Sequence, residues 1–235
     1  MKKAGSISHP CLCVALLFCL FPLLPAETLT YQEVEGTATV IHSLTIHPTP
    51  SGFLVELSSS RPGGGAVRQT FQTAPDLSTL AWTFSDPERQ MELSARRQGE
   101  VVTLSGSFRG RPVAKEFKTG GLPWNQLFQM GLENFALATA GSMKFCSIGT
   151  QRPGEMKMGK FTVTRENEEK ILLGGKEIAA VRLRVSLSGL LSIFWHSDYW
   201  YRKSDGCFLR YRGKNRPGGP VAVSELVAEK VDESK

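Results

Sequence analysis

The chain lacks the short motifs that announce the common enzyme and nucleic-acid-binding chemistries. Its sequence has no HExxH or HxH histidine pair, no Gly-x-Ser-x-Gly elbow, and no Gly-Lys-Ser/Thr after the triple glycine Gly63–Gly65. Such motifs position metals, nucleophilic serines and phosphates. The net charge of +6 is spread along the chain, without the basic stripe of a nucleic-acid-binding protein. We therefore predict no cofactor, no metal site and no nucleic-acid partner.

Long apolar runs are confined to the N-terminus. Lys2 and Lys3 precede the apolar run Cys11–Leu24, and Pro25-Ala26 then leads into a polar sequence. A basic start, an apolar core of about 7–15 residues and a small residue at its end are typical of a secretory signal peptide. We predict a signal peptide over 1–26, cleaved after Ala26, and a single β-rich domain over 27–235. The mature protein is then not integral to the membrane; an uncleaved anchor is the alternative.

Cysteine is scarce once the leader is set aside. Three of the five cysteines lie within it, and only Cys146 and Cys207 remain in the predicted mature chain. In an oxidising compartment the two could form a disulfide, or they could be two buried thiols that never meet. Spacing alone does not decide between these alternatives. Two cysteines without nearby histidines make a poor metal site.

Strand-like patterns are what the chain has in abundance. Thr37–Ile46 is rich in β-branched residues, and Ile178–Leu187 alternates apolar side chains with arginine and serine. Turn-forming residues recur at intervals of roughly 8–12 residues between such runs, which is typical of antiparallel β architecture. The sequence therefore predicts a mainly β fold.

One segment departs from the strand pattern. Between Gly121 and Gly141, apolar residues including Trp124 and Phe128 follow the 3- and 4-residue spacing of one helix face, and Pro123 suits a first helical position. We expect one amphipathic helix over about 123–140. It either covers the sheet core or serves as a lid over a ligand cavity.

Aromatic and basic side chains supply the candidate ligand-binding residues. Phe194–Gly213 predicts an aromatic-rich hairpin over the turn Ser204-Asp205-Gly206. Its tryptophans could stack on sugars or lipids, or could stabilise cross-strand pairing. Arginines on one sheet face could attract an anionic envelope molecule, or could form an ordinary solvated face. The candidates are Trp124, Phe128, Trp195, Trp200, Arg182 and Arg184.

A catalytic alternative centres on one histidine. In an extended strand, His196 and Asp198 share a face, so an oriented histidine–carboxylate pair is geometrically feasible. No serine or cysteine nucleophile can be paired with them from the sequence, and we name no catalytic residue.

Several segments together resemble an exported family of Gram-negative bacteria known as domain of unknown function 3108. They are Leu29-Thr-Tyr31, Leu122-Pro-Trp124, Ser188-Gly-Leu-Leu-Ser-Ile-Phe-Trp195, and Tyr199-Trp-Tyr with Asp205-Gly-Cys-Phe-Leu-Arg210. The resemblance implies a periplasmic protein with a large curved antiparallel sheet or half-open barrel, somewhat like the lipoprotein-carrier half-barrels. It implies no catalytic residues.

These observations favour a non-enzymatic periplasmic protein that binds an apolar or amphiphilic envelope ligand, a lipid or a glycan. A concave apolar site with aromatic side chains suits such a ligand. Two alternatives remain open at this point: a hydrolase acting on envelope glycan or lipid, and a structural or assembly factor of the cell envelope.

Overall fold

The computed structural model describes residues 25–61, 63–139, 141–152, 155–189, 195–215 and 219–231. The predicted signal peptide, apart from Pro25 and Ala26, lies outside these residues, as does the run from Leu190 to Phe194. Within the described part of the chain, no helix is long and apolar enough to cross a membrane.

The described residues form one antiparallel sheet of 14 strands, in the order β8-β7-β6-β5-β4-β3-β2-β1-β14-β13-β12-β11-β10-β9. Most neighbours in the sheet are neighbours in sequence, as expected for strands joined by short turns. This confirms the predicted mainly β fold. The strands are β1 (Glu27–Glu35), β2 (Ala38–Thr49), β3 (Gly52–Ser60), β4 (Val67–Thr73), β5 (Thr79–Asp86), β6 (Met91–Gln98), β7 (Val101–Phe108), β8 (Arg111–Lys118), β9 (Ser142–Arg152), β10 (Glu155–Leu173), β11 (Lys176–Leu187), β12 (His196–Arg202), β13 (Phe208–Lys214) and β14 (Val221–Val231), with a 3₁₀ turn η1 (Pro87–Arg89) after β5.

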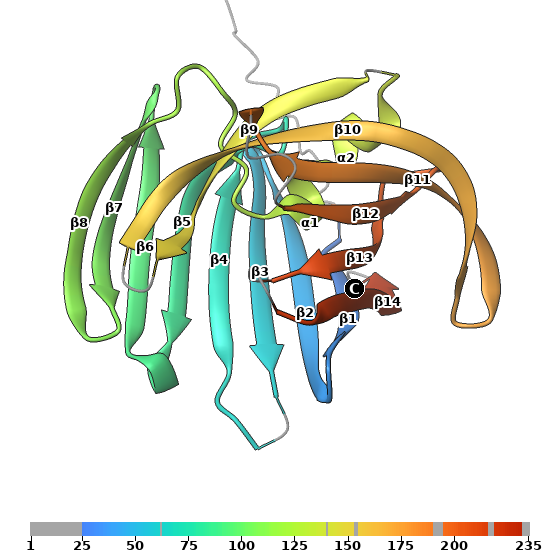
Figure 1. Cartoon of the computed structure of the whole chain (residues 1–235), viewed down its shortest axis with the longest axis horizontal. Coiled ribbons are helices and arrows are strands. Elements are labelled where there is room, and N and C mark those ends of the chain that lie inside the picture. The colour runs from blue at the N-terminus through green and yellow to red at the C-terminus, as the bar shows by residue number, and fades with distance from the viewer. Residues whose placement is uncertain are drawn as a thin grey trace, which may run out of the picture.

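The sheet curves so strongly that its two halves face each other. In Figure 1, β3 to β8 run steeply while β10 to β13 cross them at a large angle, and the helices lie between. The sheet is not closed, because the end strands β8 and β9 do not pair. One contact near the opening is the amine of Lys115, which donates to the carbonyl of Met156 at 3.1 Å. The predicted large curved antiparallel sheet is confirmed.

Alternation along the strands sorts side chains between the two faces. In β11, Val181, Leu183 and Val185 are buried on the concave face, while Arg182 and Arg184 point to the other. The predicted hairpin is present as β12 and β13, and Gly206 in its turn has a φ of 79°. Successive side chains in a strand point to opposite faces, so each strand gives one face to the core.

The predicted single helix over about 123–140 is wrong in its start and its continuity. The structure has two short helices, α1 (Phe128–Gly131) and α2 (Glu133–Leu137). Residues before α1 are extended, because Cys146 N–H donates to the Pro123 carbonyl and Asn125 N–H donates to the Cys146 carbonyl, both at 2.9 Å. Residues 123–125 thus pair with the edge of β9 instead of forming the helix that their apolar spacing predicts.

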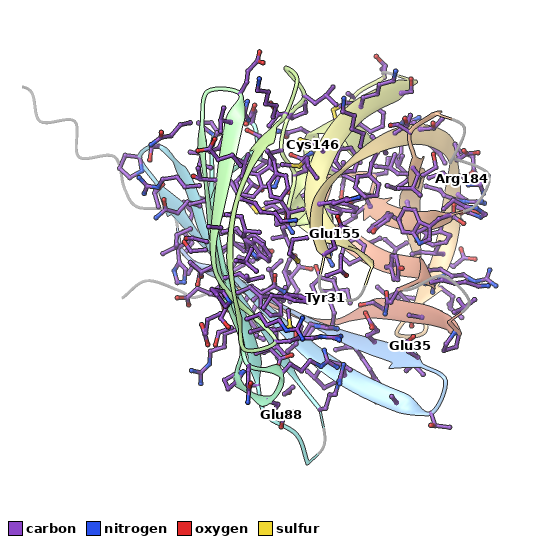
Figure 2. All side chains as sticks on the ribbon, turned by 60° about the vertical axis from the view of Figure 1, so that its left-hand side comes forward. Tyr31, Glu35, Glu88, Cys146, Glu155 and Arg184 are labelled. Carbon is purple, nitrogen blue, oxygen red and sulfur yellow. The ribbon has the colours of Figure 1, made fainter. Side chains whose placement is uncertain are left out.

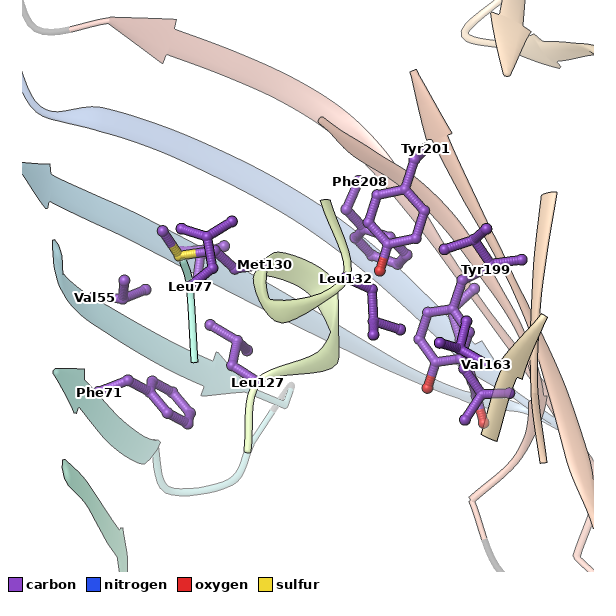
Figure 3. Close-up of a cluster of buried hydrophobic side chains, with 14 of the residues drawn as sticks. Val55, Phe71, Leu77, Leu127, Met130, Leu132, Val163, Tyr199, Tyr201 and Phe208 are labelled. Carbon is purple, nitrogen blue, oxygen red and sulfur yellow. The ribbon is translucent and has the colours of Figure 1, made fainter. Parts of the chain in front are cut away.

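The helical segment packs inside the concave face. Figure 3 shows Leu127, Met130 and Leu132 between one wall that carries Val55 and Phe71 and another that carries Val163 and Tyr199. Met130, Leu132, Phe135 and Ala136 are all buried. Helices of four and five residues are not stable alone, so this packing holds them.

Gln126 joins this segment to both halves of the sheet. Its side-chain Nε2 donates to the Ile148 carbonyl at 2.9 Å, and its Oε1 accepts from Ile148 N–H at 2.9 Å and from Trp124 Nε1 at 3.0 Å. Its backbone N–H donates to Thr79 Oγ1, at the start of β5, at 2.9 Å. The amide therefore replaces a missing neighbour strand at the β9 edge while its backbone reaches the opposite wall.

Gln126→Ala is expected to lower the free energy of unfolding by about 3 kcal/mol, because it leaves groups of Ile148 and Trp124 without partners at about 1–3 kcal/mol each. Gln129→Ala is the matched control, since the Gln129 side chain makes no hydrogen bond to any of the described residues; its cost should stay under about 1 kcal/mol. Urea denaturation of both variants measures the difference. Equal losses would contradict the linking role of Gln126.

Candidate functional site

A cavity of about 170 Å³ lies on the concave face beside α1. Strands β1 to β4, β13 and β14 and the start of the helical segment contribute to its wall. Its apolar part is formed by Tyr31, Leu44, Leu57, Leu127 and Phe208. The Tyr31 hydroxyl donates to the Phe208 carbonyl at 3.1 Å, across β14, which lies between β1 and β13 in the sheet. The cavity is therefore a gap left between six neighbouring strands in the middle of the sheet and the start of the helical segment.

A polar chain of three side chains lies in the same wall. His42 Nδ1 is 2.8 Å from Ser59 Oγ, and His42 Nε2 is 3.5 Å from a carboxylate oxygen of Glu33. These residues come from β2, β3 and β1, which are adjacent in the sheet. His42 is directly opposite Ser59 in the strand register and directly opposite Tyr31 on the other side. The strand register therefore brings the side chains of Glu33, His42 and Ser59 together.

Glu33 carries a charge in this half-buried setting. Burial alone would raise the pKa of its carboxyl group, but the nearby imidazole of His42 and the hydrogen bond from Asn215 outweigh burial and lower it below its ordinary value. The Asn215 amide donates to Glu33 Oε1 at 3.0 Å. At neutral pH the cavity wall consequently contains an ionised carboxylate.

Three further polar side chains line the cavity, those of Gln69, Gln129 and Ser224. Gln69 accepts a hydrogen bond from Trp82 Nε1 at 3.0 Å through its side-chain oxygen, so its amino group is the part left to donate. Ser224, which faces Glu33 in the register of β1 and β14, is buried and also lines the cavity. An asymmetric wall results, apolar on one part and rich in uncharged hydrogen-bonding groups on the other.

The order serine, histidine, glutamate matches the arrangement that activates a nucleophilic serine. Acyl transfer also needs free donors for an oxyanion, commonly backbone N–H groups. At these positions β1, β2 and β3 are each paired on both sides, which engages their backbone N–H groups in the ladder. The geometry therefore favours holding a polar group over cleaving it.

None of the six residues predicted to bind ligand lines this cavity. Three lie elsewhere on the concave side. Trp124 is fully buried beside β9, and the ring of Phe128 packs within 4.9 to 6.1 Å of Phe145, Phe161 and Tyr199. Trp195 contacts Phe161 at 5.9 Å. These aromatics fill the core beside the cavity.

The other three lie on the outer face of the sheet. Arg182 and Arg184 both pair with Asp198, at 3.4 and 3.1 Å from one of its oxygens. Trp200 is 8% exposed, lies beneath the guanidinium of Arg182, and donates from Nε1 to Glu169 at 2.6 Å. In Figure 2, Arg184 lies at the periphery, well away from Tyr31. The two predicted sets are therefore on opposite faces of the sheet, and no single site contains both.

The His196–Asp198 pair, which the sequence left as a geometrically feasible alternative, does not form in the structure. His196 is exposed, and the hydrogen bonds of Asp198 among the described residues go to Arg182 and Arg184. Those arginines lie in β11, the strand next to β12, and Arg184 is directly opposite Asp198. They are therefore closer to the carboxylate than His196, which lies two residues away along the same strand.

Cys146 and Cys207 are both free thiols. The sequence left open a disulfide or two separate thiols, and the structure has two separate thiols. Cys146 lies in β9 and Cys207 just before β13, and β10, β11 and β12 lie between those strands. At about 4.8 Å per strand, that separation far exceeds the reach of a disulfide. Burial raises the pKa of Cys146 to about 11 and of Cys207 to about 12.

The sequence did not reveal the polar residues of the cavity wall: Glu33, His42, Ser59, Gln69, Gln129 and Ser224. A signal existed at His42, which stands on the otherwise apolar face of β2 with Leu44 and Ile46. Its partners belong to other strands and become visible only with the register. Among the described residues, no group of three His, Cys, Asp or Glu side chains could hold a metal ion.

No protein family model and no curated protein matches the chain. Solved structures with partial similarity include the hypothetical lipoprotein YmcC from Escherichia coli (K12), with 9% identity, a TM-score of 0.44, and coverage of 87% of this chain and 88% of that one. A LolA superfamily protein from Nitrosomonas europaea has 7% identity, a TM-score of 0.29, and coverage of 92% and 89%. A DUF1329 family protein from Desulfovibrio piger has 9% identity, a TM-score of 0.28, and coverage of 92% and 88%. Similarities this low carry no inference about ligand or role, and membership of the family of unknown function 3108 stays a prediction.

A half-buried carboxyl group, that of Glu133, lies at the start of α2. Burial and the negative charges of Glu27 and Asp205 raise the pKa of Glu133 to about 8. In the unfolded chain the group has a pKa near 4.5, so the folded state retains the proton over the interval between these values. The free energy of unfolding therefore falls as the pH rises from about 4.5 to about 8.

Glu133→Gln imitates the protonated form and removes this penalty. We expect it to raise Tm at about pH 8 and to change Tm little at about pH 5. Thermal unfolding followed by circular dichroism at both pH values provides the measurement, with Glu116→Gln on the exposed strand β8 as the control. A Tm gain of the same size at both pH values would contradict the assignment.

Proposed function

We propose that this protein is a non-enzymatic binding protein of the periplasm, whose ligand is an apolar or amphiphilic molecule of the cell envelope. The observation that carries the proposal is the cavity beside α1, which has an apolar wall and a polar wall. Ligand sites in proteins are commonly concave and mostly apolar, with a few polar groups that fix orientation. The basic start and apolar run at the N-terminus support export, and the curved open sheet supplies the concave face.

The volume limits which part of a ligand the cavity holds. At about 170 Å³ it is smaller than the roughly 300–1,000 Å³ of sites that enclose a drug-sized molecule. It suits the end of a chain and its headgroup, with the remainder of the ligand outside. Leu127, in the segment that leads into α1, forms part of the cavity wall. The same side chain would therefore contact the ligand and pack the helical segment against the sheet.

The polar chain of Glu33, His42 and Ser59 does not by itself favour the hydrolase alternative. The paired strands leave no free backbone N–H groups there to stabilise an oxyanion. The exposed His196 has no hydrogen-bonded carboxylate among the described residues. Binding without turnover is the function that this geometry supports best.

Leu57→Trp fills the cavity and is expected to weaken binding of an apolar probe at least tenfold, a loss of about 1.4 kcal/mol. The uncharged dye N-phenyl-1-naphthylamine, whose fluorescence rises in apolar surroundings, reports the dissociation constant. Leu172→Trp is the matched control, because Leu172 is 63% exposed and outside the cavity wall. If the two variants bind the dye alike, the cavity is not the binding site.

A further inference from the structure

We propose that the cavity selects single-chain amphiphiles with an uncharged, hydroxyl-bearing headgroup and discriminates against those whose headgroup is a carboxylate. The inference rests on the proposed function and adds the chemical class of the ligand. It comes from the positions of the polar side chains in the strand register and from the sign of the charge among them.

The register places apolar and polar residues at different levels of the cavity. Leu44 pairs with Leu57, and two residues further along each strand, toward the end that holds the β1–β2 turn, His42 pairs with Ser59. Glu33 and Ser224, which face each other across β1 and β14, lie at this same end. An amphiphile is therefore oriented with its chain toward Leu44 and Leu57 and its headgroup toward the turn.

The charge at the headgroup level is negative. The lining contains one carboxylate, Glu33, and no lysine or arginine among the described residues that form it. The titratable groups near Glu33 are His42, 3.5 Å from it, Glu35, which shares the amide of Asn215, and the exposed Arg61. A ligand carboxylate placed here would lie beside an ionised glutamate in a half-buried site, where like charges are poorly screened.

The remaining groups at this level suit hydroxyls. Ser59 and Ser224 can each donate and accept a hydrogen bond, and Gln69 offers the amino group that Trp82 leaves unused. Hydroxyl groups can likewise donate and accept. A glycerol-like headgroup can therefore satisfy these side chains, whereas a carboxylate only accepts and meets Glu33.

The test compares two probes of matched chain length, a 1-O-alkylglycerol and a fatty acid, at about pH 8, where the acid is ionised. The ether linkage excludes hydrolysis as a cause of any difference. Competition against N-phenyl-1-naphthylamine gives both dissociation constants. We expect the alkylglycerol to bind at least tenfold more tightly than the fatty acid.

Glu33→Gln removes the charge with little change in shape and should reduce this ratio to about threefold or less, mainly by tighter binding of the fatty acid. Glu56→Gln, on the exposed side of β3, is the matched control and should leave the ratio unchanged. A wild-type measurement that needs no variant is the alkyltrimethylammonium of the same length, which lacks both the carboxylate and the hydroxyls and should bind more tightly than the fatty acid but less tightly than the alkylglycerol.

The outcomes separate the inference from the function on which it rests. Equal affinities of the wild-type protein for alkylglycerol and fatty acid, an unchanged ratio in a folded Glu33→Gln protein, or exclusion of the cation would overturn the headgroup selectivity while leaving ligand binding in place. Failure of all three amphiphiles to displace the dye would overturn both.

Discussion

The fold depends on how an open sheet is held in its curved form, and the side-chain amide of Gln126 is the central interaction. A sheet this long has two free edges and two halves that must stay together. Gln126 bonds to both backbone groups of Ile148 at the β9 edge, while its own backbone reaches Thr79 in the opposite half. The Gln126 side chain thus satisfies backbone groups that a neighbouring strand would otherwise satisfy, at the edge where the sheet stays open.

This arrangement divides the concave face into a filled part and an unfilled part. On one side, Phe128, Phe145, Phe161 and Tyr199 pack ring against ring. On the other, the wall facing Leu127 changes from leucine to histidine and serine, and a cavity remains. Close packing is the rule in protein interiors, so a gap that combines apolar and polar walls beside a packed aromatic cluster is a candidate ligand site.

Much of the fold follows from local pattern in the sequence. The alternation in Ile178–Leu187 predicts a strand with one buried face, and Asp205-Gly206 predicts the hairpin of β12 and β13; both are present. The helix was predicted too long, because its apolar spacing does not reveal that Pro123 and Asn125 pair with Cys146. Pairing between residues distant in sequence is set by tertiary structure, and propensity yields to it.

The candidate site was less accessible from the sequence for the same reason. Aromatic and arginine side chains were predicted to bind the ligand. The alternation of side chains along the strands, however, places Trp200 with Arg182 on the outer face and Tyr199 with Tyr201 on the inner one. Glu33, His42 and Ser59 are ordinary residues in three separate strands. Only the register that sets them side by side makes them a group.

The measurement that tests the account most directly is a methyl NMR titration of the selectively labelled protein with a 1-O-alkylglycerol. The account predicts chemical-shift changes centred on Leu44, Leu57 and Leu127, with Leu172 on the exposed part of β10 unaffected. Changes centred on the outer face, or no saturable change at the three cavity leucines, would contradict it.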